Sequence, residues 1–234
     1  MLAATAAHAL TATELVAKNI EAKGGGAALQ SVKSLRREGR LIVNGGQYVL
    51  ELRETKQRPD SIRTEISMQG LSQVQAYDGK EGWRIDPFGG RKDPERMPAD
   101  DVKEYAEDAT IDGVLADAVA AGSSIEYLGT EDIDGTPAHK LKVVRKDGGL
   151  QYVYLDPDYF LEIRVESQRV VRGVKRTSVT DYGNYEKVGG VFWPLSIESG
   201  IKGAGDPAKF EYRSAVVNPE IVPGYFSFPV TVKQ

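Results

Sequence analysis

Cysteine is absent from the 234-residue sequence, and histidine occurs only twice. The lack of cysteine excludes disulfide bonds, thiolate metal sites and a cysteine nucleophile. No apolar run approaches the roughly 18 residues of a membrane-spanning helix. We therefore expect a chain that does not span a membrane, and we expect it to hold no metal ion and no cofactor.

The chain also lacks an excess of charge of either sign. Its net charge is −4, with acidic and basic residues interspersed, and this disfavours a protein that follows nucleic-acid phosphates. Hydrophobic residues make up 41% and charged residues 27% of the chain, as in ordinary folded proteins. No shift in composition marks a domain boundary, so we expect a single domain over residues 11–234.

Residues 1–10 differ from the rest in being rich in alanine. Ala7-His8-Ala9 fits the small-x-small rule for signal peptidase cleavage, but the positive segment and most of the hydrophobic core of a full signal are missing. We interpret residues 1–10 as the remnant of a signal peptide, with a disordered alanine-rich start as the alternative. The first interpretation predicts an exported, periplasmic protein.

Two helical segments are expected next. Thr11 and Glu14 have the spacing of a capping box, apolar residues follow at helical spacing, and Gly24-Gly25-Gly26 ends the segment. The pattern predicts a helix over residues 12–23 and a short helical piece over residues 27–32.

Beyond residue 32 the spacing of apolar residues changes to a period of two. Leu50 and Leu52 alternate with Glu51 and Arg53, and later segments repeat the pattern. Turn sequences separate these runs at Asn44-Gly45-Gly46, Asp78-Gly79, Asp134-Gly135, Asp147-Gly148-Gly149 and Gly189-Gly190. Together they predict about ten strands in antiparallel order.

Residues 97–122 interrupt the strands with a segment rich in Ala, Asp and Glu that has helical spacing. We expect Gly113 to divide it, because glycine destabilises a helix interior by about 1 kcal/mol. A long sheet that is apolar on one face must curl or be covered. The sequence thus predicts a mainly β protein with some α: a strongly curved antiparallel sheet, forming a half-open, unclosed barrel, with helices over its concave face. Periodicity leaves open whether that face is a filled core or a cavity.

Three motifs suggest chemistry, and each has a simpler interpretation. His139 could serve a hydrolase, but no Gly-x-Ser-x-Gly motif is present, and a partly buried or edge histidine is favoured. The motif at Asp132 resembles the start of a calcium loop, yet Val143 stands where its closing glutamate should be, which favours a hairpin turn. The basic segment 169–176 could meet lipid headgroups or anionic partners; a solvated hairpin with Gly173 at its tip is favoured.

The segment YDGKEGWRIDPFGG, residues 77–90, lacks the spacing of a nucleotide-binding loop and is interpreted as a hairpin. Its Asp78-Gly79-Lys80, Trp83 and Pro87-Phe88 resemble the "DGK..W...PF" hairpin of the LolA/LolB-like periplasmic lipoprotein-sorting family. Two more matches are Lys56-Gln57-Arg58-Pro59-Asp60, similar to the family's "KRPN" step, and Tyr225-Phe226-Ser227-Phe228-Pro229, similar to its closing "FxFxPP" run.

This resemblance covers the chain from about residue 12 onward. It implies a half-open barrel with a helical lid, formed here by the insertion at 97–122, that holds the acyl chains of a lipoprotein or another lipid. It also implies that Arg58 hydrogen-bonds backbone carbonyls of the lid and latches the empty cavity shut. The alternative for Arg58 is a surface arginine before a strand.

For the cavity lining we predict the apolar faces of the central strands, with a filled core as the alternative for all of them. The predicted residues are Leu50, Leu52, Ile62, Ile66, Met68, Trp83, Ile85, Leu161, Ile163 and Val165, with Trp193 and Phe210 nearer the rim.

The resulting hypothesis is a periplasmic carrier that binds acyl chains by burial, without catalysis, in the sorting of outer-membrane lipoproteins. Membrane-bound donor and acceptor proteins would be its partners. The alternative from another class is an envelope sensor or scaffold that binds a protein partner with the same curved sheet.

Overall fold

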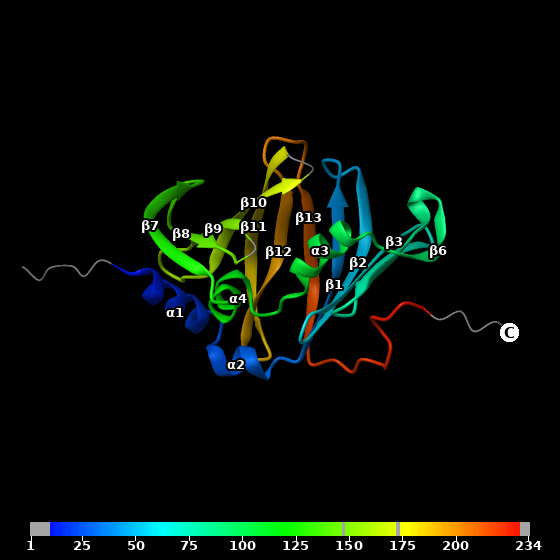
Figure 1. The fold of residues 1–234 in the computed structure, drawn as a ribbon, viewed down its shortest axis with the longest axis horizontal. Coiled ribbons are helices and arrows are strands. Elements are labelled where there is room, and N and C mark those ends of the chain that lie inside the picture. The colour runs from blue at the N-terminus through cyan, green and yellow to red at the C-terminus, as the bar shows by residue number, and fades with distance from the viewer. Residues whose placement is uncertain (1–9, 147, 172–173, 230–234) are drawn as a thin grey trace, which may run out of the picture.

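The computed structural model of the protein describes residues 10–146, 148–171 and 174–229 (Figure 1). The signal remnant predicted at 1–10 lies, except for residue 10, outside the described residues, as do Gly173 and Asp147 of the predicted turns. Within the described ranges, no helix is both long enough and apolar enough to cross a membrane.

The thirteen strands of the described residues belong to one antiparallel sheet, in the order β6-β5-β4-β3-β2-β1-β13-β12-β11-β10-β9-β8-β7. The strands are β1 (Ser34–Val43), β2 (Tyr48–Gln57), β3 (Ser61–Met68), β4 (Leu71–Tyr77), β5 (Gly82–Asp86), β6 (Arg91–Arg96), β7 (Ser124–Ile133), β8 (Thr136–Val144), β9 (Leu150–Leu155), β10 (Glu162–Val171), β11 (Val174–Val188), β12 (Val191–Ile201) and β13 (Ala208–Val217). Strands β6 and β7 form the two edges, so the barrel is not closed. The predicted fold class is confirmed, with more strands than the ten expected.

The first two helices begin and end within one residue of their predicted bounds. They are α1 (Ala12–Ala22), α2 (Gly26–Ser31), the 3-10 turns η1 (Pro87–Gly89) and η2 (Glu107–Ala109), α3 (Ala99–Ala106) and α4 (Val114–Ala120). At the start of α1, the Glu14 backbone N–H donates to Thr11 Oγ1 at 3.2 Å, and Thr11 N–H donates to Glu14 Oε2 at 2.8 Å. Gly113 precedes α4 with φ +91°, which suits glycine, and separates α4 from α3 and η2 as expected.

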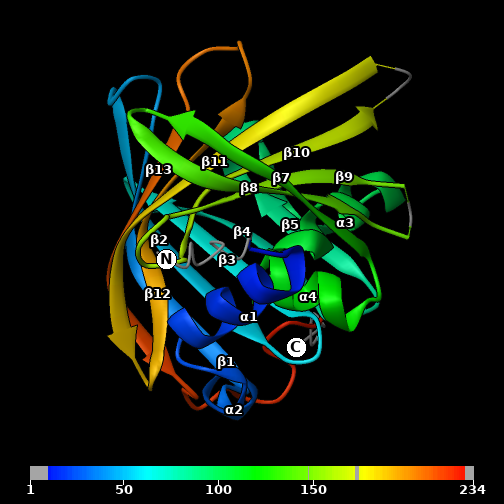
Figure 2. The same ribbon diagram turned by 90° about the vertical axis from the view of Figure 1, so that its left-hand side faces the viewer.

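Residues 97–122, called the lid segment below, connect the two edge strands of the sheet. The chain leaves β6, crosses the concave side through α3, η2 and α4, and enters β7 (Figures 1 and 2). Helices α1 and α4 lie side by side on one half of this face (Figure 2), where Leu15 and Leu115 pack in one buried cluster with Leu141 and Val153. Since those helices fill only part of the concavity, space remains between the lid segment and the other strands.

The C-terminal segment packs on the opposite, convex face. Trp83 Nε1 donates to the Phe226 carbonyl at 2.8 Å, and Arg63 Nη1 donates to the Tyr225 carbonyl at 2.9 Å. The ring of Phe228 meets Trp83 edge-on, with 6.3 Å between centroids. Two of the three motifs that suggested the family resemblance therefore contact each other.

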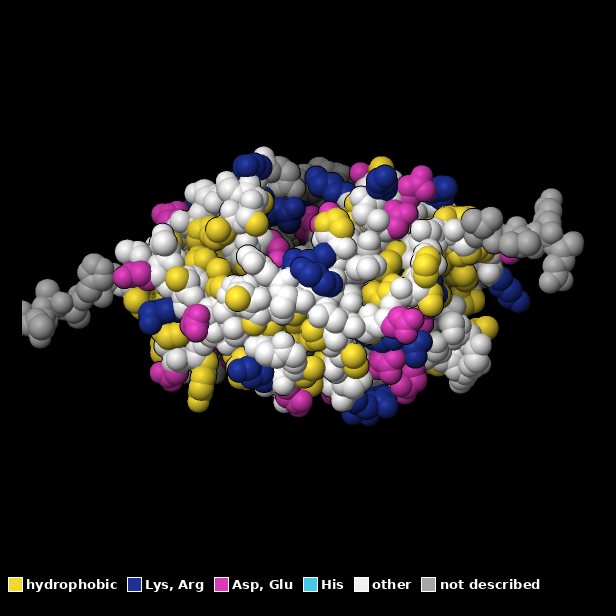
Figure 3. All heavy atoms as spheres, turned by 90° about the horizontal axis from the view of Figure 1, so that it is seen from below, with side chains coloured by type: hydrophobic (Ala, Val, Ile, Leu, Met, Phe, Trp, Pro, Cys, Tyr) yellow, Lys and Arg dark blue, Asp and Glu magenta, His cyan; other side chains and the backbone are white. Residues whose placement is uncertain are grey.

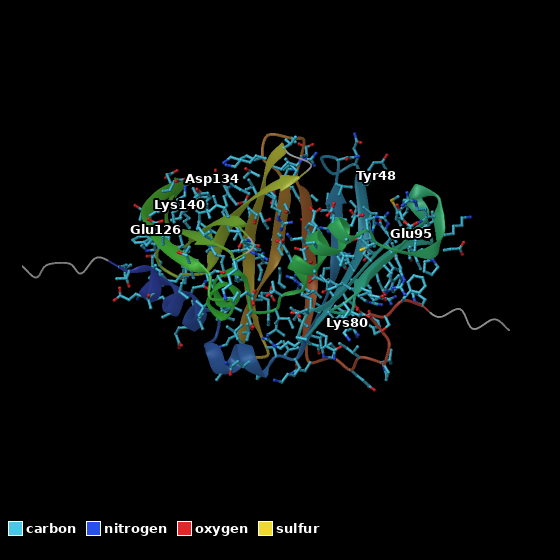
Figure 4. The ribbon with its side chains drawn as sticks, in the orientation of Figure 1. Tyr48, Lys80, Glu95, Glu126, Asp134 and Lys140 are labelled. Atoms are coloured by element: carbon cyan, nitrogen blue, oxygen red, sulfur yellow. The ribbon has the colours of Figure 1, made fainter. Side chains whose placement is uncertain are left out.

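The hairpin interpretations of two motifs are also confirmed. Asp78 Oδ1 accepts hydrogen bonds from the backbone N–H groups of Lys80 and Glu81, at 3.0 and 2.9 Å. Lys80 is exposed at the lower end of the molecule (Figure 4). Asp132 Oδ1 similarly accepts from Gly135 N–H at 3.1 Å in the β7–β8 turn.

Candidate ligand-binding site

A cavity of about 1120 Å³ lies between the lid segment and the concave face of the sheet. Typical small-molecule sites have about 300–1,000 Å³. Strands β1 to β3 and β10 to β13 supply the floor and walls, and residues from Glu104 to Ala121 supply the cover. The size and the cover make this space the candidate site.

Some of the predicted lining residues border this cavity. They are Leu52, Ile62, Ile66, Val165, Trp193 and Phe210. Leu52 and Ile66 are directly opposite each other on β2 and β3, which puts both side chains on the same face. Leu50 and Met68 share that face but pack into the adjoining apolar cluster with Leu195 and Tyr212.

The structure corrects the placement of Trp83 and Ile85, which lie on the convex face. Trp83 is opposite Ala76, and Ala76 is opposite Arg63, whose neighbour Ile62 faces the cavity. Since side chains alternate between the faces of a strand, Arg63 and Trp83 point away from the cavity. The C-terminal segment covers Trp83, which explains its burial.

Leu161 and Ile163 also lie outside the cavity lining. Strand β10 begins at Glu162, and its pairing with β9 shifts by one residue between Glu162 and Arg164. This bulge replaces the predicted alternation, so that Glu162 and Val165 both border the cavity. Glu162 is 5% exposed, although its alternation with Leu161 and Ile163 predicted that it would lie on the solvent-exposed face.

Trp193 is not at the rim. It is 4% exposed and packs with Leu29, Val32 and Ile111, and its Nε1 donates to the Val188 carbonyl at 3.1 Å.

A buried polar cluster at the cavity floor was missed by the sequence analysis. Arg37 Nη2 and Nε lie 2.7 and 3.1 Å from Glu54 Oε1, and Arg37 Nη1 donates to the Pro194 carbonyl at 3.1 Å. The guanidinium also lies 4.0 Å from the centre of the Tyr212 ring. The pattern held one signal for this cluster: Glu54 continues the Leu50-Leu52 alternation and thus belongs to the apolar face.

Electrostatics keep this pair ionised. Desolvation acts to raise the pKa of Glu54, but the charges of Arg37 and Lys56 and hydrogen bonds from Arg37 and Tyr212 hold that pKa below its ordinary value. Desolvation acts to lower the pKa of Arg37, whereas Glu54 and Tyr212 outweigh it and raise that pKa. Burial raises the pKa of Tyr182 and of Tyr212, so both phenols stay neutral.

Arg58 joins the sheet to the lid segment. Its Nη1 lies 2.7 Å from Asp112 Oδ2, and its Nη2 contacts Asp112 Oδ1. The same guanidinium donates to two carbonyls of α2 and the residue after it, Leu29 at 3.1 Å and Val32 at 2.7 Å. The family resemblance implied contacts with lid carbonyls; in this chain the lid partner is a carboxylate and the carbonyls belong to the α2 end.

Two lysines hold the same loop of the lid segment. Lys23 Nζ donates to the Asp112 carbonyl at 2.9 Å, and Lys56 Nζ donates to the Thr110 carbonyl at 3.2 Å. Lys23 is also 3.2 Å from Glu162 Oε1. Three cations from separate elements therefore bind the short loop between η2 and α4.

His139 lies away from the cavity. Its Nδ1 is 2.9 Å from the Tyr127 hydroxyl, and its ring stacks on Phe160 with 5.9 Å between centroids. Desolvation lowers the pKa of His139. Across the part of the chain that the structure describes, no group of three His, Asp or Glu side chains could hold a metal ion.

Comparison with known proteins identifies similarity in fold. No protein-family model and no curated protein matches this sequence. Among solved structures, a LolA superfamily protein from Nitrosomonas europaea superposes with a TM-score of 0.60 and 14% identity, over 94% of this chain and 98% of that one. A Vibrio parahaemolyticus domain described as an outer membrane lipoprotein-sorting protein gives 0.62 and 12%, over 92% and 97%.

A DUF1329 family protein from Desulfovibrio piger has a TM-score of 0.62 and 12% identity, over 92% of this chain and 96% of that chain. In all three cases nearly the full length of both chains is matched. The chain therefore has a LolA-like fold, the fold that its hairpin, Arg-Pro and C-terminal motifs predicted.

Proposed function

We propose that the protein is a periplasmic carrier that binds the acyl chains of a lipoprotein or another lipid in the cavity beneath the lid segment. The observation that carries the proposal is the cavity of about 1120 Å³ under a cover held by Arg58. A LolA-like fold shared with a lipoprotein-sorting domain supports a role in outer-membrane lipoprotein sorting. Membrane-bound donor and acceptor proteins would then load and unload the carrier.

The walls suit binding by burial. Leu52, Ile62, Ile66 and Phe210 border the cavity with apolar side chains, and each buried CH₂ of an acyl chain contributes about 0.8 kcal/mol. The Arg37–Glu54 pair satisfies its own charges, so it requires no ligand. Opening the lid would break the contacts of Arg58, Lys23 and Lys56 with its loop, and this cost reduces the net affinity so that cargo can be released.

Native mass spectrometry of protein purified from a Gram-negative periplasm tests the proposal, together with uptake of the neutral apolar dye N-phenyl-1-naphthylamine. We expect a co-purified lipid or fatty acid and saturable dye fluorescence. A ligand-free mass with no dye uptake would overturn the carrier function. Recovery of a defined envelope protein by such a ligand-free chain would favour the sensor or scaffold instead.

A matched pair of variants locates the binding. Ile66 borders the cavity, whereas Val49 is 50% exposed on the convex face. We expect Ile66→Asp to weaken dye binding by more than about tenfold, because a carboxylate in an apolar wall must be desolvated. Val49→Asp should bind as the unaltered protein does; equal effects of the two substitutions would place the dye elsewhere.

A further inference from the structure

Three arginines gather where the cavity meets solvent. Arg169 on β10 is directly opposite Arg176 on β11, and Arg145 follows the end of β8, which lies two strands from β10 in the sheet. All three border the cavity; Arg176 is exposed and the other two are partly exposed. Figure 2 shows the β10–β11 hairpin extending toward the side of the molecule where the lid segment lies. We call these residues the mouth arginines.

Their arrangement is unfavourable unless an anion is present. Like charges directly opposite on antiparallel strands destabilise the pair, because the Cβ atoms are only about 5 Å apart. The β10–β11 register imposes this contact on Arg169 and Arg176. The mouth arginines thus concentrate positive charge at one point of a chain whose net charge is −4.

One carboxylate of the lid segment already contacts this site. Glu107 Oε2 lies 3.2 Å from Arg145 Nη1 and also accepts from Arg169 Nη2. The next residue, Asp108, interacts electrostatically with Arg169. No ion pair to Arg176 occurs within residues 10–146, 148–171 and 174–229. Glu107 of the lid segment therefore pairs with two of the mouth arginines, and among the described residues Arg176 has no carboxylate partner.

Arg37 at the cavity floor differs from the mouth arginines because groups within the protein satisfy its charge. Arg37 is 6% exposed and is bonded to Glu54 and to a backbone carbonyl, so it is not available to a ligand. The cavity therefore combines apolar side chains on β2, β3 and β13 with accessible positive charge at one opening. This distribution is complementary to an amphiphile with an anionic headgroup.

We propose that the mouth arginines bind the anionic headgroup, a phosphate or a carboxylate, of an amphiphile whose chains occupy the cavity. In the empty protein Glu107 occupies this site in place of the headgroup. A bound headgroup competes with Glu107 for Arg145 and Arg169, so that loading also releases the lid segment at its η2 turn. The inference rests on the proposed carrier function and specifies its ligand class.

The test compares three probes on the full chain: dodecyl phosphate, the zwitterionic dodecylphosphocholine with the same chain, and inorganic phosphate. Affinities are measured by displacement of N-phenyl-1-naphthylamine and by calorimetry, below micelle-forming concentrations. The double variant Arg169→Gln/Arg176→Gln is compared with Arg40→Gln/Arg213→Gln, two exposed arginines that pair with Glu211 and Glu51. Both doubles change the net charge equally.

We expect the mouth double variant to bind dodecyl phosphate about tenfold more weakly or worse, because charge-assisted hydrogen bonds are lost. Its binding of the neutral dye should not weaken, and the control double should match the unaltered protein. Unchanged affinity for dodecyl phosphate, with dye binding intact, would overturn the headgroup site and leave the carrier function standing. Failure of the unaltered protein to bind dye or amphiphile would overturn both.

Inorganic phosphate and dodecylphosphocholine show whether the site binds a free anion or the anionic headgroup of an amphiphile. Equal affinity for inorganic phosphate and dodecyl phosphate would overturn the proposal that the ligand is an amphiphile, and would indicate a site for free anions. Equal affinity for the two dodecyl probes would overturn the preference for an anionic headgroup. If the double variant does not fold, Arg176→Gln alone, at an exposed position, makes the same comparison with a smaller expected loss.

The variant Glu107→Gln distinguishes competition between Glu107 and the headgroup from simple opening of the lid segment. If Glu107 occupies the headgroup site, this variant binds dodecyl phosphate more tightly while its affinity for the neutral dye rises less. An equal rise for both probes would show that Glu107 only holds the lid, and would overturn its role as an internal substitute for the headgroup.

Discussion

Arg58 and Asp112 form a two-pronged ion pair that connects the β2–β3 turn to the lid segment, with 2.7 Å between Nη1 and Oδ2. Their side chains are 28% and 24% exposed. Asp112 is in the loop that also accepts hydrogen bonds from Lys23 and Lys56. Residues of the β2–β3 hairpin and of the end of α1 thus contact a segment that is distant in sequence.

The first prediction concerns this pair. Asp112→Asn should speed the uptake of N-phenyl-1-naphthylamine about fivefold, because a partly exposed pair of good geometry contributes about 1 kcal/mol to the closed lid. Stopped-flow fluorescence measures the rate. Glu198→Gln, which breaks the exposed pair with Lys209 outside the lid, is the control and should leave the rate unchanged. An uptake rate equal to that of the unaltered protein would show that the pair is no latch.

The second prediction separates the two tryptophans. Trp83→Phe should lower the free energy of unfolding by about 1–2 kcal/mol through loss of the hydrogen bond to Phe226, with no change in dye affinity. Trp193→Phe should weaken dye binding, because Trp193 borders the cavity. Urea unfolding and dye titration of both variants make the comparison. Reduced dye affinity in Trp83→Phe, beyond its loss of folded protein, would contradict the placement of Trp83 on the convex face.

The third prediction concerns the buried pair at the cavity floor. Glu54→Gln should cost about 3–5 kcal/mol of folding free energy, because it leaves Arg37 charged and unpaired in a buried position. The side chains of Arg37 and Glu54 are only 7% and 13% exposed. Replacing both, as Arg37→Met/Glu54→Leu, should recover most of the loss.

The matched control is Glu211→Gln, which breaks the exposed pair with Arg40 and should cost no more than about 1 kcal/mol. Chemical denaturation curves give all of these values. A cost for Glu54→Gln as small as that of the control would mean that water reaches Arg37 in the folded protein.

The fourth prediction is a pH dependence. Desolvation raises the pKa of Asp108 above its ordinary value of 3.8 in the folded protein. The folded state then holds this proton more tightly than the unfolded state, so the contribution of Asp108 to stability falls as pH rises from 3.8 through the raised pKa. Asp108→Asn should therefore be more stable than the unaltered protein at neutral pH, and this difference should vanish as pH falls toward 3.8.

Thermal unfolding across that pH range measures the difference, with Asp206→Asn in the exposed β12–β13 turn as the control. A stability difference for Asp108→Asn that does not change with pH would refute the desolvation of Asp108.

Several parts of the fold were predictable because they depend on neighbouring residues. The capping box at Thr11 and Glu14, the break at Gly113 and the turn at Asp78 are formed by contacts within a few residues. The site was predictable only in part. Leu52 and Ile66 could be assigned to a cavity wall, whereas the Arg37–Glu54 pair could not, because its two members are 17 positions apart and meet only after β1 pairs with β2.

Local patterns in the sequence were sufficient to predict the strand and turn periodicity, the helical insertion and the motifs of a LolA-like fold. The face that each apolar residue occupies depends on how the strands pair and on what covers them. Period-two alternation is the same for both faces of a strand, so pairing with β4 and the cover of the C-terminal segment put Trp83 on the convex side. The bulge at Glu162 and the β10–β11 register, which brings Arg169 opposite Arg176, depend on contacts between strands.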